Sequence, residues 1–151
     1  MEDIALEWFN IYGLIIMCVI LVPNIIFGIT HKEGFENKYN NKIVEMTEQF
    51  GRFGSFALMV VNIPVMTLGY WFDNAELIYI TINGILCLSY CFIWIILWNK
   101  NGITKSLILS ILPSIMFLFS AIITLNIPLI ITAILFSFSH ILISYKNAII
   151  R

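Results

Sequence analysis

Long stretches of hydrophobic residues alternate with short polar segments along the chain. Three of these stretches cover residues 9–29, 50–71 and 77–98. Each has about 20 residues, the length that an α-helix needs to cross the hydrocarbon core of a bilayer, which is about 30 Å thick. The pattern therefore predicts three membrane-spanning helices in the first two thirds of the chain.

A fourth stretch, residues 106–145, contains no charged residue. As one helix it would be about 60 Å long, twice what a bilayer accommodates, so it must fold back on itself. The segment LNIPL offers the break, because Asn126 suits a turn or cap and Pro128 suits the first turn of a new helix. Two further spans, 107–125 and 128–145, complete the prediction. The expected fold is all-α, a polytopic membrane helix bundle with five transmembrane helices in a single domain.

The most polar part of the chain lies between the first two predicted spans. Residues 30–56 contain eight of the seventeen charged residues. Hydrophobic residues recur there at intervals of three and four, the spacing of one helical face; they are Tyr39, Ile43, Met46, Phe50 and Phe53. We therefore expect an amphipathic segment over 30–49 that continues into the second span. The two would form one helix from about residue 41 to residue 71, with Asn40 or Asn41 as its N-cap.

The basic residues divide unevenly between the two predicted sides of the membrane. All eight fall on the side reached after the first, third and fifth spans: Lys32, Lys38, Lys42, Arg52, Lys100, Lys105, Lys146 and Arg151. The opposite side receives acidic residues and no Lys or Arg. The positive-inside rule then predicts a cytoplasmic segment 30–49, with the amino terminus outside and the carboxyl terminus in the cytoplasm. A four-span alternative with a re-entrant last segment would place Lys105 and Lys146 on opposite sides.

The composition also indicates a membrane protein. Hydrophobic residues make up 60% of the chain and charged residues 11%, whereas a soluble domain has about 25% charged residues. The amino-terminal residues are acidic, unlike the basic start of a cleavable signal peptide, so the first span is expected to be retained. We therefore expect a multi-pass protein of the cell membrane whose main partner is the lipid bilayer. The high content of Ile, Asn and Lys favours a bacterial cytoplasmic membrane.

The sequence lacks the common motifs of catalysis and of metal, phosphate or nucleic-acid binding. The three cysteines lie in hydrophobic stretches without metal-ligand spacing, which is typical of small core residues. We therefore expect no cofactor, no metal and no nucleic-acid partner, and an enzyme is the less favoured class of protein.

Four polar side chains lie where lipid would tolerate them least, namely Asn24, Asn62, Asn83 and His140. Each should face protein or water, because an unpaired polar group in hydrocarbon costs several kcal/mol. Spans two and three form a predicted hairpin in which Asn62 and Asn83 lie at nearly the same depth. We expect their amides to meet, directly or through water, as an interhelical polar contact. A titratable imidazole such as that of His140 suggests proton relay or ligand binding, or a bond to a neighbouring helix.

Prolines interrupt three of the predicted helices, at Pro23, Pro64 and Pro113. Each lacks an amide hydrogen and so frees a backbone carbonyl. Broken helices of this kind form substrate sites in transporters, although proline is also common in membrane helices.

Arg52 is the most distinctive charge at the edge of a span. Glu48 precedes it by four residues, the favoured order for an ion pair on a helix. The pair fits either a solvated polar face or the gate of a vestibule that faces the cytoplasm. Gly51 and Ser55 would let another helix approach closely, either in the same chain or in a second copy. Trp94 lies on an aromatic face that suits either helix packing or a ligand cavity.

Three functions fit these features. The first is a transport-related or small-molecule-binding membrane protein with a cytoplasmic-side polar cavity among Asn24, Arg52, Pro113 and His140. The second is a non-enzymatic accessory or assembly subunit that docks a membrane partner protein through its cytoplasmic helix, with tightly packed spans and no cavity. A homo-oligomer is the other partner state that we consider. The third is a membrane enzyme acting on a lipid or prenyl substrate, which would need a groove open to lipid and an activated polar pair at His140.

Overall fold

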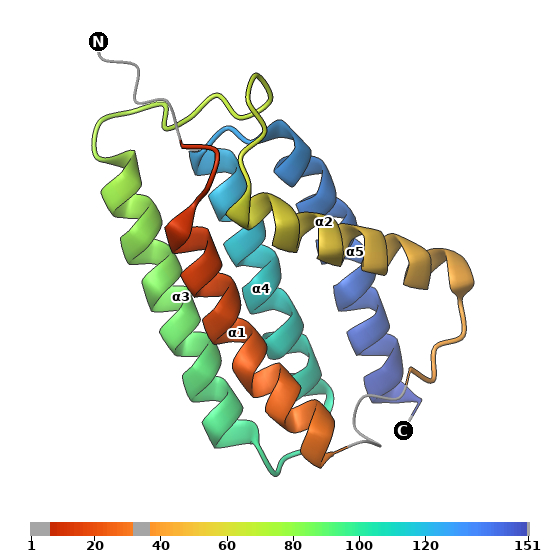
Figure 1. The fold of residues 1–151 in the computed structure, drawn as a ribbon. Coiled ribbons are helices and arrows are strands. Elements are labelled where there is room, and N and C mark those ends of the chain that lie inside the picture. Colours follow the sequence, from red (N-terminus) through yellow and green to blue (C-terminus); the bar gives the residue numbers. More distant parts are fainter. Residues whose placement is uncertain (1–6, 32–36, 151) are drawn as a thin grey trace.

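The computed structural model describes residues 7–31 and 37–150, and within them the fold is all-helical (Figure 1). The structure contains the following helices: α1 (Ile11–Thr30), α2 (Lys42–Val60), α3 (Ala75–Leu97), α4 (Ile103–Ile123) and α5 (Ile127–Ile149). In Figure 1, α1 begins at the upper end of the molecule and α5 ends at the lower end. The turn between α3 and α4 lies at the lower end, and the turn between α4 and α5 at the upper end.

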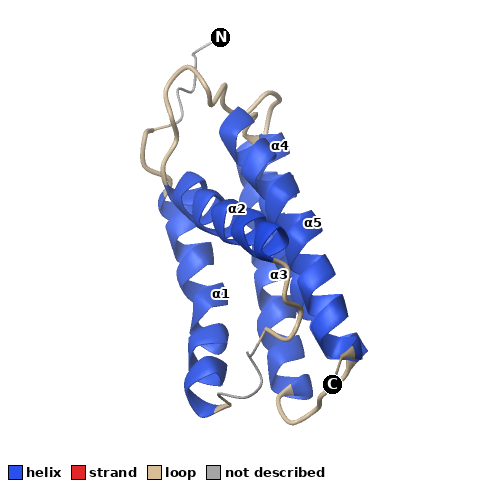
Figure 2. Cartoon of the chain, turned by 90° about the vertical axis from the view of Figure 1, so that its right-hand side faces the viewer, coloured by secondary structure: helices blue, strands red, loops and turns tan. Residues whose placement is uncertain are grey.

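The helices form a bundle with one steeply inclined member. α1, α3 and α4 run side by side, with α3 in contact with both of the others. α5 packs against α4 at the upper end and diverges from it towards the lower end. α2 crosses α5 at a steep angle, and both views show it inclined to the other helices (Figures 1 and 2). α2 and α5 form the most extensive helix pair in the described chain.

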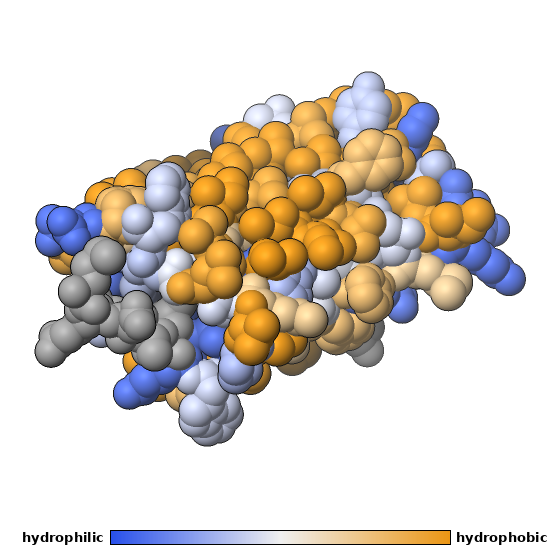
Figure 3. Space-filling model, turned by 90° about the horizontal axis from the view of Figure 1, so that it is seen from above, coloured by the Kyte–Doolittle hydropathy of each residue, from blue (hydrophilic) through white to orange (hydrophobic). Residues whose placement is uncertain are grey.

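Four of the helices are long and apolar enough to cross a membrane: α1, α3, α4 and α5. Their bounds lie within a few residues of four of the predicted spans. Their outward faces carry many large hydrophobic side chains, among them Ile15, Leu88 and Phe138. Hydrophobic residues cover most of the face drawn in Figure 3, with hydrophilic residues towards its edges. This apolar exterior suits lipid rather than water as the surrounding solvent.

The predicted helix starts at two asparagines are confirmed. Asn126 caps α5, because its side-chain oxygen accepts a hydrogen bond from the backbone N–H of Leu129 at 3.0 Å. Pro128 follows in the first turn, as expected. Asn41 caps α2 through the N–H of Val44 in the same way. The uncharged stretch 106–145 therefore folds back at the predicted place.

The predicted continuous helix from residue 41 to residue 71 is wrong, because α2 ends at Val60. Pro64 explains the break: proline disfavours helical conformation in the residue before it and cannot donate a helix hydrogen bond. Pro64 consequently lies in the connection to α3 rather than in a helix, whereas Pro23 and Pro113 lie inside α1 and α4 as predicted. Val65 adopts a left-handed conformation, with φ of 73°.

The connection between α2 and α3 bonds to other parts of the chain through its backbone. The amide of Asn62 donates to the carbonyl of Trp8 at 2.8 Å, and that of Asn10 donates to the carbonyl of Val60 at 2.7 Å. Further along, the amide of Gly69 donates to the carbonyl of Thr124 at 3.1 Å. These bonds satisfy irregular backbone at the upper end, where lipid could offer no partner.

Small residues allow α2 and α5 to pack closely. A methyl group added at Gly51 would lie only 2.5 Å from the backbone nitrogen of Phe136. One turn further on, Ser55 donates a hydrogen bond to the hydroxyl of Thr132 at 3.2 Å. The small-residue pair Gly51 and Ser55 thus serves contact with α5 in the same chain and is not available as a seam between two copies.

Candidate functional site

A cavity of about 730 Å³ lies below α2, between the lower halves of the other four helices. We call it the α2 cavity. Its volume is in the range of small-molecule sites, which is about 300–1,000 Å³. Its wall includes four residues expected from the sequence to share a polar cavity, namely Asn24, Arg52, Pro113 and His140, together with Trp94.

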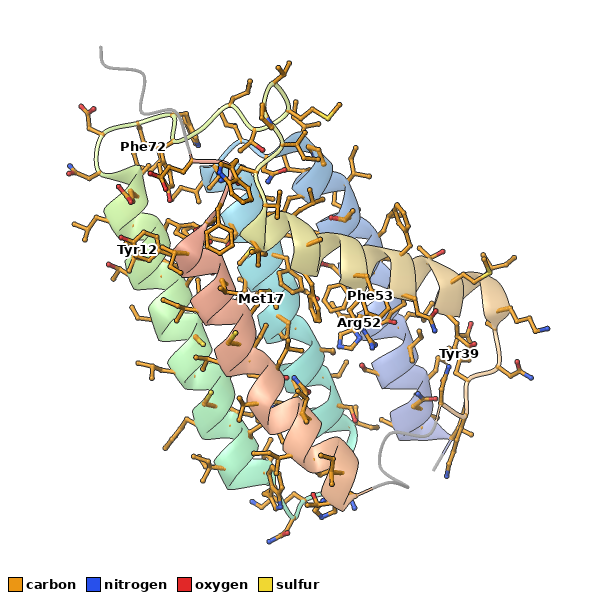
Figure 4. The ribbon with its side chains drawn as sticks, viewed as in Figure 1. Tyr12, Met17, Tyr39, Arg52, Phe53 and Phe72 are labelled. Atoms are coloured by element: carbon orange, nitrogen blue, oxygen red, sulfur yellow. The ribbon has the colours of Figure 1, made fainter. Side chains whose placement is uncertain are left out.

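α2 turns its polar side towards this cavity. Glu45, Glu48 and Arg52 line it, and Arg52 points from α2 towards the region flanked by α4 and α5 (Figure 4). Three residues of the hydrophobic stripe of the same helix face outward, with Ile43 78%, Met46 71% and Phe50 64% exposed, while Phe53 borders the cavity. This orientation is the reverse of that in a water-soluble protein, where the apolar face of a helix points to the core.

Glu48 is the centre of a three-residue polar cluster. It is 4% exposed, and its Oε1 accepts hydrogen bonds from Arg52 Nε at 3.0 Å and from His140 Nδ1 at 2.9 Å. Arg52 Nη2 donates to the same oxygen. The two basic partners compensate the charge of a carboxylate that burial would otherwise destabilise. The structure thus contains the predicted Glu48–Arg52 pair and adds His140 to it.

The bond to Glu48 fixes the roles of the two nitrogens of His140. An ionised carboxylate can only accept, so Nδ1 carries the hydrogen of this bond. In the neutral imidazole, Nε2 is then left as an acceptor. The ring also stacks on Phe136, with centroids 4.6 Å apart. Carboxylate and aromatic ring together hold the imidazole in one orientation at the cavity wall.

The crossing of α2 over α5 brings these residues together, although Glu48 and His140 are 92 positions apart in the chain. Gly51 contacts the backbone of Phe136 at the crossing point. Glu48 lies about one helical turn before Gly51, and His140 lies about one turn after Phe136. The glycine therefore sets the distance between the helices that the Glu48–His140 bond requires.

Opposite α2, the wall is built by α1 and α3. The side-chain amide of Asn24 donates to the hydroxyl of Tyr90 and to the carbonyl of Ile20, each at 2.7 Å. Trp94 lies one turn beyond Tyr90, with the two rings in T-shaped contact at 6.4 Å. The predicted aromatic face of α3 is buried, and its lower part lines the α2 cavity.

A buried lysine lies at the lower end of the cavity. Lys105 is 8% exposed and donates a hydrogen bond to the carbonyl of Trp98 at 3.0 Å. Its ammonium lies 4.3 Å from the ring centroid of Phe27 and 5.1 Å from that of Trp94. Aromatic faces attract a cation at these distances.

Asn62 and Asn83 lie outside the α2 cavity, and each side chain bonds to a partner other than the direct one that was predicted. The amide of Asn62 donates to the carbonyl of Glu7 at 2.8 Å. Asn83 instead pairs with the hydroxyl of Ser120 on α4, at 3.1 Å. The sequence-based depth estimate assumed a continuous second helix, so it failed where α2 ends. Both asparagines join segments at the upper half of the bundle.

Two features of the site were not predicted. Lys105 was expected only as a loop charge, and a bond from His140 to a neighbouring helix was considered without Glu48 as its partner. The four-residue spacing of Phe136 and His140 is a signal that could have indicated a fixed ring on α5. No sequence pattern indicated which helix would supply its partner.

Within residues 7–31 and 37–150, no group of three or more His, Cys, Asp or Glu side chains is arranged to hold a metal ion. The donors at the cavity wall are instead cationic, hydroxyl, amide and indole groups, which suit an organic or anionic ligand. Comparisons of the chain with family models, with curated proteins and with solved structures give no match.

Proposed function

We propose that the chain is a multi-pass membrane protein that binds a small molecule in the α2 cavity, in a role related to transport. The observation that carries the proposal is the inward-turned polar face of α2. A helix with Glu48 and Arg52 on its inner side and exposed Phe50 on its outer side suits a protein that encloses a polar site within lipid.

The proposed topology keeps five crossings, with the amino terminus outside and the carboxyl terminus in the cytoplasm. α1 begins and α5 ends at opposite ends of the bundle, which supports an odd number of crossings. The second crossing would be made by α2 together with the connection that follows it. The α3–α4 turn, which contains Lys100, and the end of α5, which contains Lys146, lie at the lower end, whereas α3 begins at the upper end just after Asp73. The positive-inside rule therefore supports a cavity on the cytoplasmic side.

Filling the cavity tests this function. Ile143 lines the α2 cavity, whereas Ile134 on the same helix is 54% exposed on the outer surface. After purification in a mild detergent, native mass spectrometry of the wild type should detect a retained small molecule. Ile143→Trp should lose it and Ile134→Trp should keep it, because only the first substitution fills the cavity. A wild type that retains nothing, or equal retention in both variants, would contradict the proposal.

A membrane enzyme acting on a lipid is the second candidate, and one observation favours it. The carboxylate-bound imidazole of His140 leaves Nε2 as an acceptor, which is the arrangement of a general base. The same mass measurement separates the two functions, since an enzyme would alter the retained molecule on prolonged incubation and a binding protein would not. The accessory-subunit alternative expected tight packing without a cavity, and the α2 cavity argues against it.

A further inference from the structure

A side opening connects the α2 cavity with the surroundings of the bundle. α1 and α5 both line the cavity, yet among the described residues their backbones make no contact, and the two helices diverge below α2 (Figures 1 and 2). Phe53 borders the cavity although it is 66% exposed, so the cavity is open beneath this part of α2. Leu21 adds an apolar side chain to the wall from α1. Large apolar side chains therefore border the opening.

In the proposed topology this opening lies at the depth of the hydrocarbon core. Leu21 is near the middle of α1, about 15 Å from either end of the helix. The core of a bilayer is about 30 Å thick, so lipid chains rather than water would meet the opening. The lower end of the cavity is different, because the exposed Asn101, in the turn between α3 and α4, lines it there.

The charged side chains in the interior of the cavity have partners in the protein. The carboxylate of Glu48 is compensated by its ion pair with Arg52. Lys105 donates to the carbonyl of Trp98 and lies against two aromatic rings. A charged ligand would lose its hydration here without gaining an unpaired counter-charge, and that loss is costly. The interior therefore favours an uncharged ligand.

One hydrogen-bonding atom of the wall is accessible and has no partner among the described residues. His140 binds Glu48 through Nδ1, which leaves Nε2. The buried unpaired side-chain atoms of the described chain are Thr67 Oγ1 and Trp94 Nε1, so Nε2 is not sealed within the protein. The His140 ring lines the α2 cavity. In the neutral imidazole Nε2 is an acceptor, and it requires a donor from the ligand.

We propose that the α2 cavity binds an uncharged amphiphile with a hydroxyl group, which enters from the bilayer between α1 and α5 and donates its hydroxyl hydrogen to Nε2 of His140. This inference rests on the proposed function and names its ligand class and its route into the cavity. A lipid alcohol carries no charge, dissolves in the bilayer and supplies the donor. Phe56, Leu109 and Phe136 line the cavity and would surround its hydrocarbon part.

The experiment is photolabelling of the full chain in phosphatidylcholine nanodiscs. Three probes share a dodecyl chain with a central diazirine and end in a hydroxyl, a sulfonate or a trimethylammonium group. Peptide mass spectrometry then compares labelling around Leu109, which lines the cavity, with labelling around Ile134, which is 54% exposed on the outer surface. This ratio cancels differences in partitioning into lipid.

The alcohol probe should label the cavity wall saturably, and excess dodecanol should suppress this labelling. The ratio of wall to outer-surface labelling should be at least about tenfold lower for both charged probes, because they bring an uncompensated charge into the cavity. His140→Phe keeps a ring beside Phe136 and removes the acceptor. It should weaken saturable labelling by the alcohol about fivefold, the effect of losing one hydrogen bond.

Tryptophan variants locate the route into the cavity. Leu21→Trp narrows the side opening, whereas Val22→Trp adds the same ring at a position of α1 that is 53% exposed and does not line the cavity. Asn101→Trp narrows the lower end instead. Shortly after the alcohol probe is added, wall labelling in Leu21→Trp should fall most of the way to the level seen with excess dodecanol. Val22→Trp and Asn101→Trp should label like the wild type.

Equal wall labelling by either charged probe would overturn the uncharged ligand class, and slower labelling in Asn101→Trp than in Leu21→Trp would overturn the route. If His140→Phe does not fold, as judged by gel filtration and circular dichroism, the probe series and the tryptophan variants still provide the test. The proposed function would stand without this inference if the alcohol did not label the wall saturably and Ile143→Trp still abolished retention of a molecule. If the wild type also retains no molecule, both proposals are wrong.

Discussion

Gly51→Ala should lower the free energy of unfolding by about 2 kcal/mol, although alanine is the better helix former. The added methyl carbon would lie 2.5 Å from the backbone nitrogen and 2.8 Å from the Cα of Phe136. Backbone atoms cannot rotate away, so α2 and α5 must separate. Overpacking of this kind typically costs about 1–3 kcal/mol, which outweighs the helix propensity of alanine at so tight a contact.

Gly84→Ala is the matched control, because a methyl group added at Gly84 on α3 would meet no atom of another helix within 4 Å. That variant should be more stable than the wild type by up to about 1 kcal/mol, the difference in helix propensity between the two residues. Denaturant titrations in detergent, followed by circular dichroism, would compare the two. If Gly51→Ala unfolds at the same denaturant concentration as Gly84→Ala, the close crossing of α2 and α5 is wrong.

Glu48→Ala should lower the free energy of unfolding by about 2 kcal/mol, because it leaves three donor nitrogens, two of Arg52 and one of His140, without their acceptor. Removal of one partner from a fully buried ion pair can cost more. Here the side chains of Arg52 and His140 are 40% and 25% exposed, so water compensates part of the loss. The measurement is again denaturation in detergent, at neutral pH.

Glu45→Ala on the same helix is the comparison for Glu48→Ala. Its carboxylate accepts one hydrogen bond, from the exposed side chain of Asn37, so the change should stay within about 0.5 kcal/mol. Glu48→Gln keeps the shape and an acceptor oxygen, and its stability should fall between those of the wild type and Glu48→Ala. A Glu48→Ala variant as stable as Glu45→Ala would show that the cluster does not hold α2 to α5.

The apolar helices were predictable because each is an uninterrupted stretch about as long as a bilayer is thick. The break before α5 was also predictable, since Asn126 and Pro128 favour that turn through their own local chemistry. The end of α2 was not, because the residues on both sides of Pro64 are hydrophobic and hydropathy does not distinguish helix from loop. Backbone hydrogen bonds to distant residues, among them Trp8 and Thr124, hold that connection in place, and no local sequence signal indicates these partners.

Hydropathy also identified part of the site. Asn24, Arg52 and His140 were identified because polar groups in hydrophobic stretches must face protein or water. Which of them meet depends on helix crossings, which the sequence does not encode locally. The Glu48–His140 bond follows from the α2–α5 crossing, and the burial of Lys105 follows from the rings that α1 and α3 place beside it.

The orientation of α2 is the central claim, and spin labels on a cysteine-free background can measure it. One label would replace Phe50, which is 64% exposed on the outer face of α2, and the other Ser144, which lines the α2 cavity. Frequent collisions of a label with dissolved oxygen indicate that it faces lipid. Frequent collisions with a water-soluble nickel complex indicate that it faces water. In nanodiscs, the label at position 50 should collide mainly with oxygen and the label at position 144 mainly with nickel. The reverse pattern would mean that α2 presents its hydrophobic face to water or protein and that no polar cavity lies beneath it.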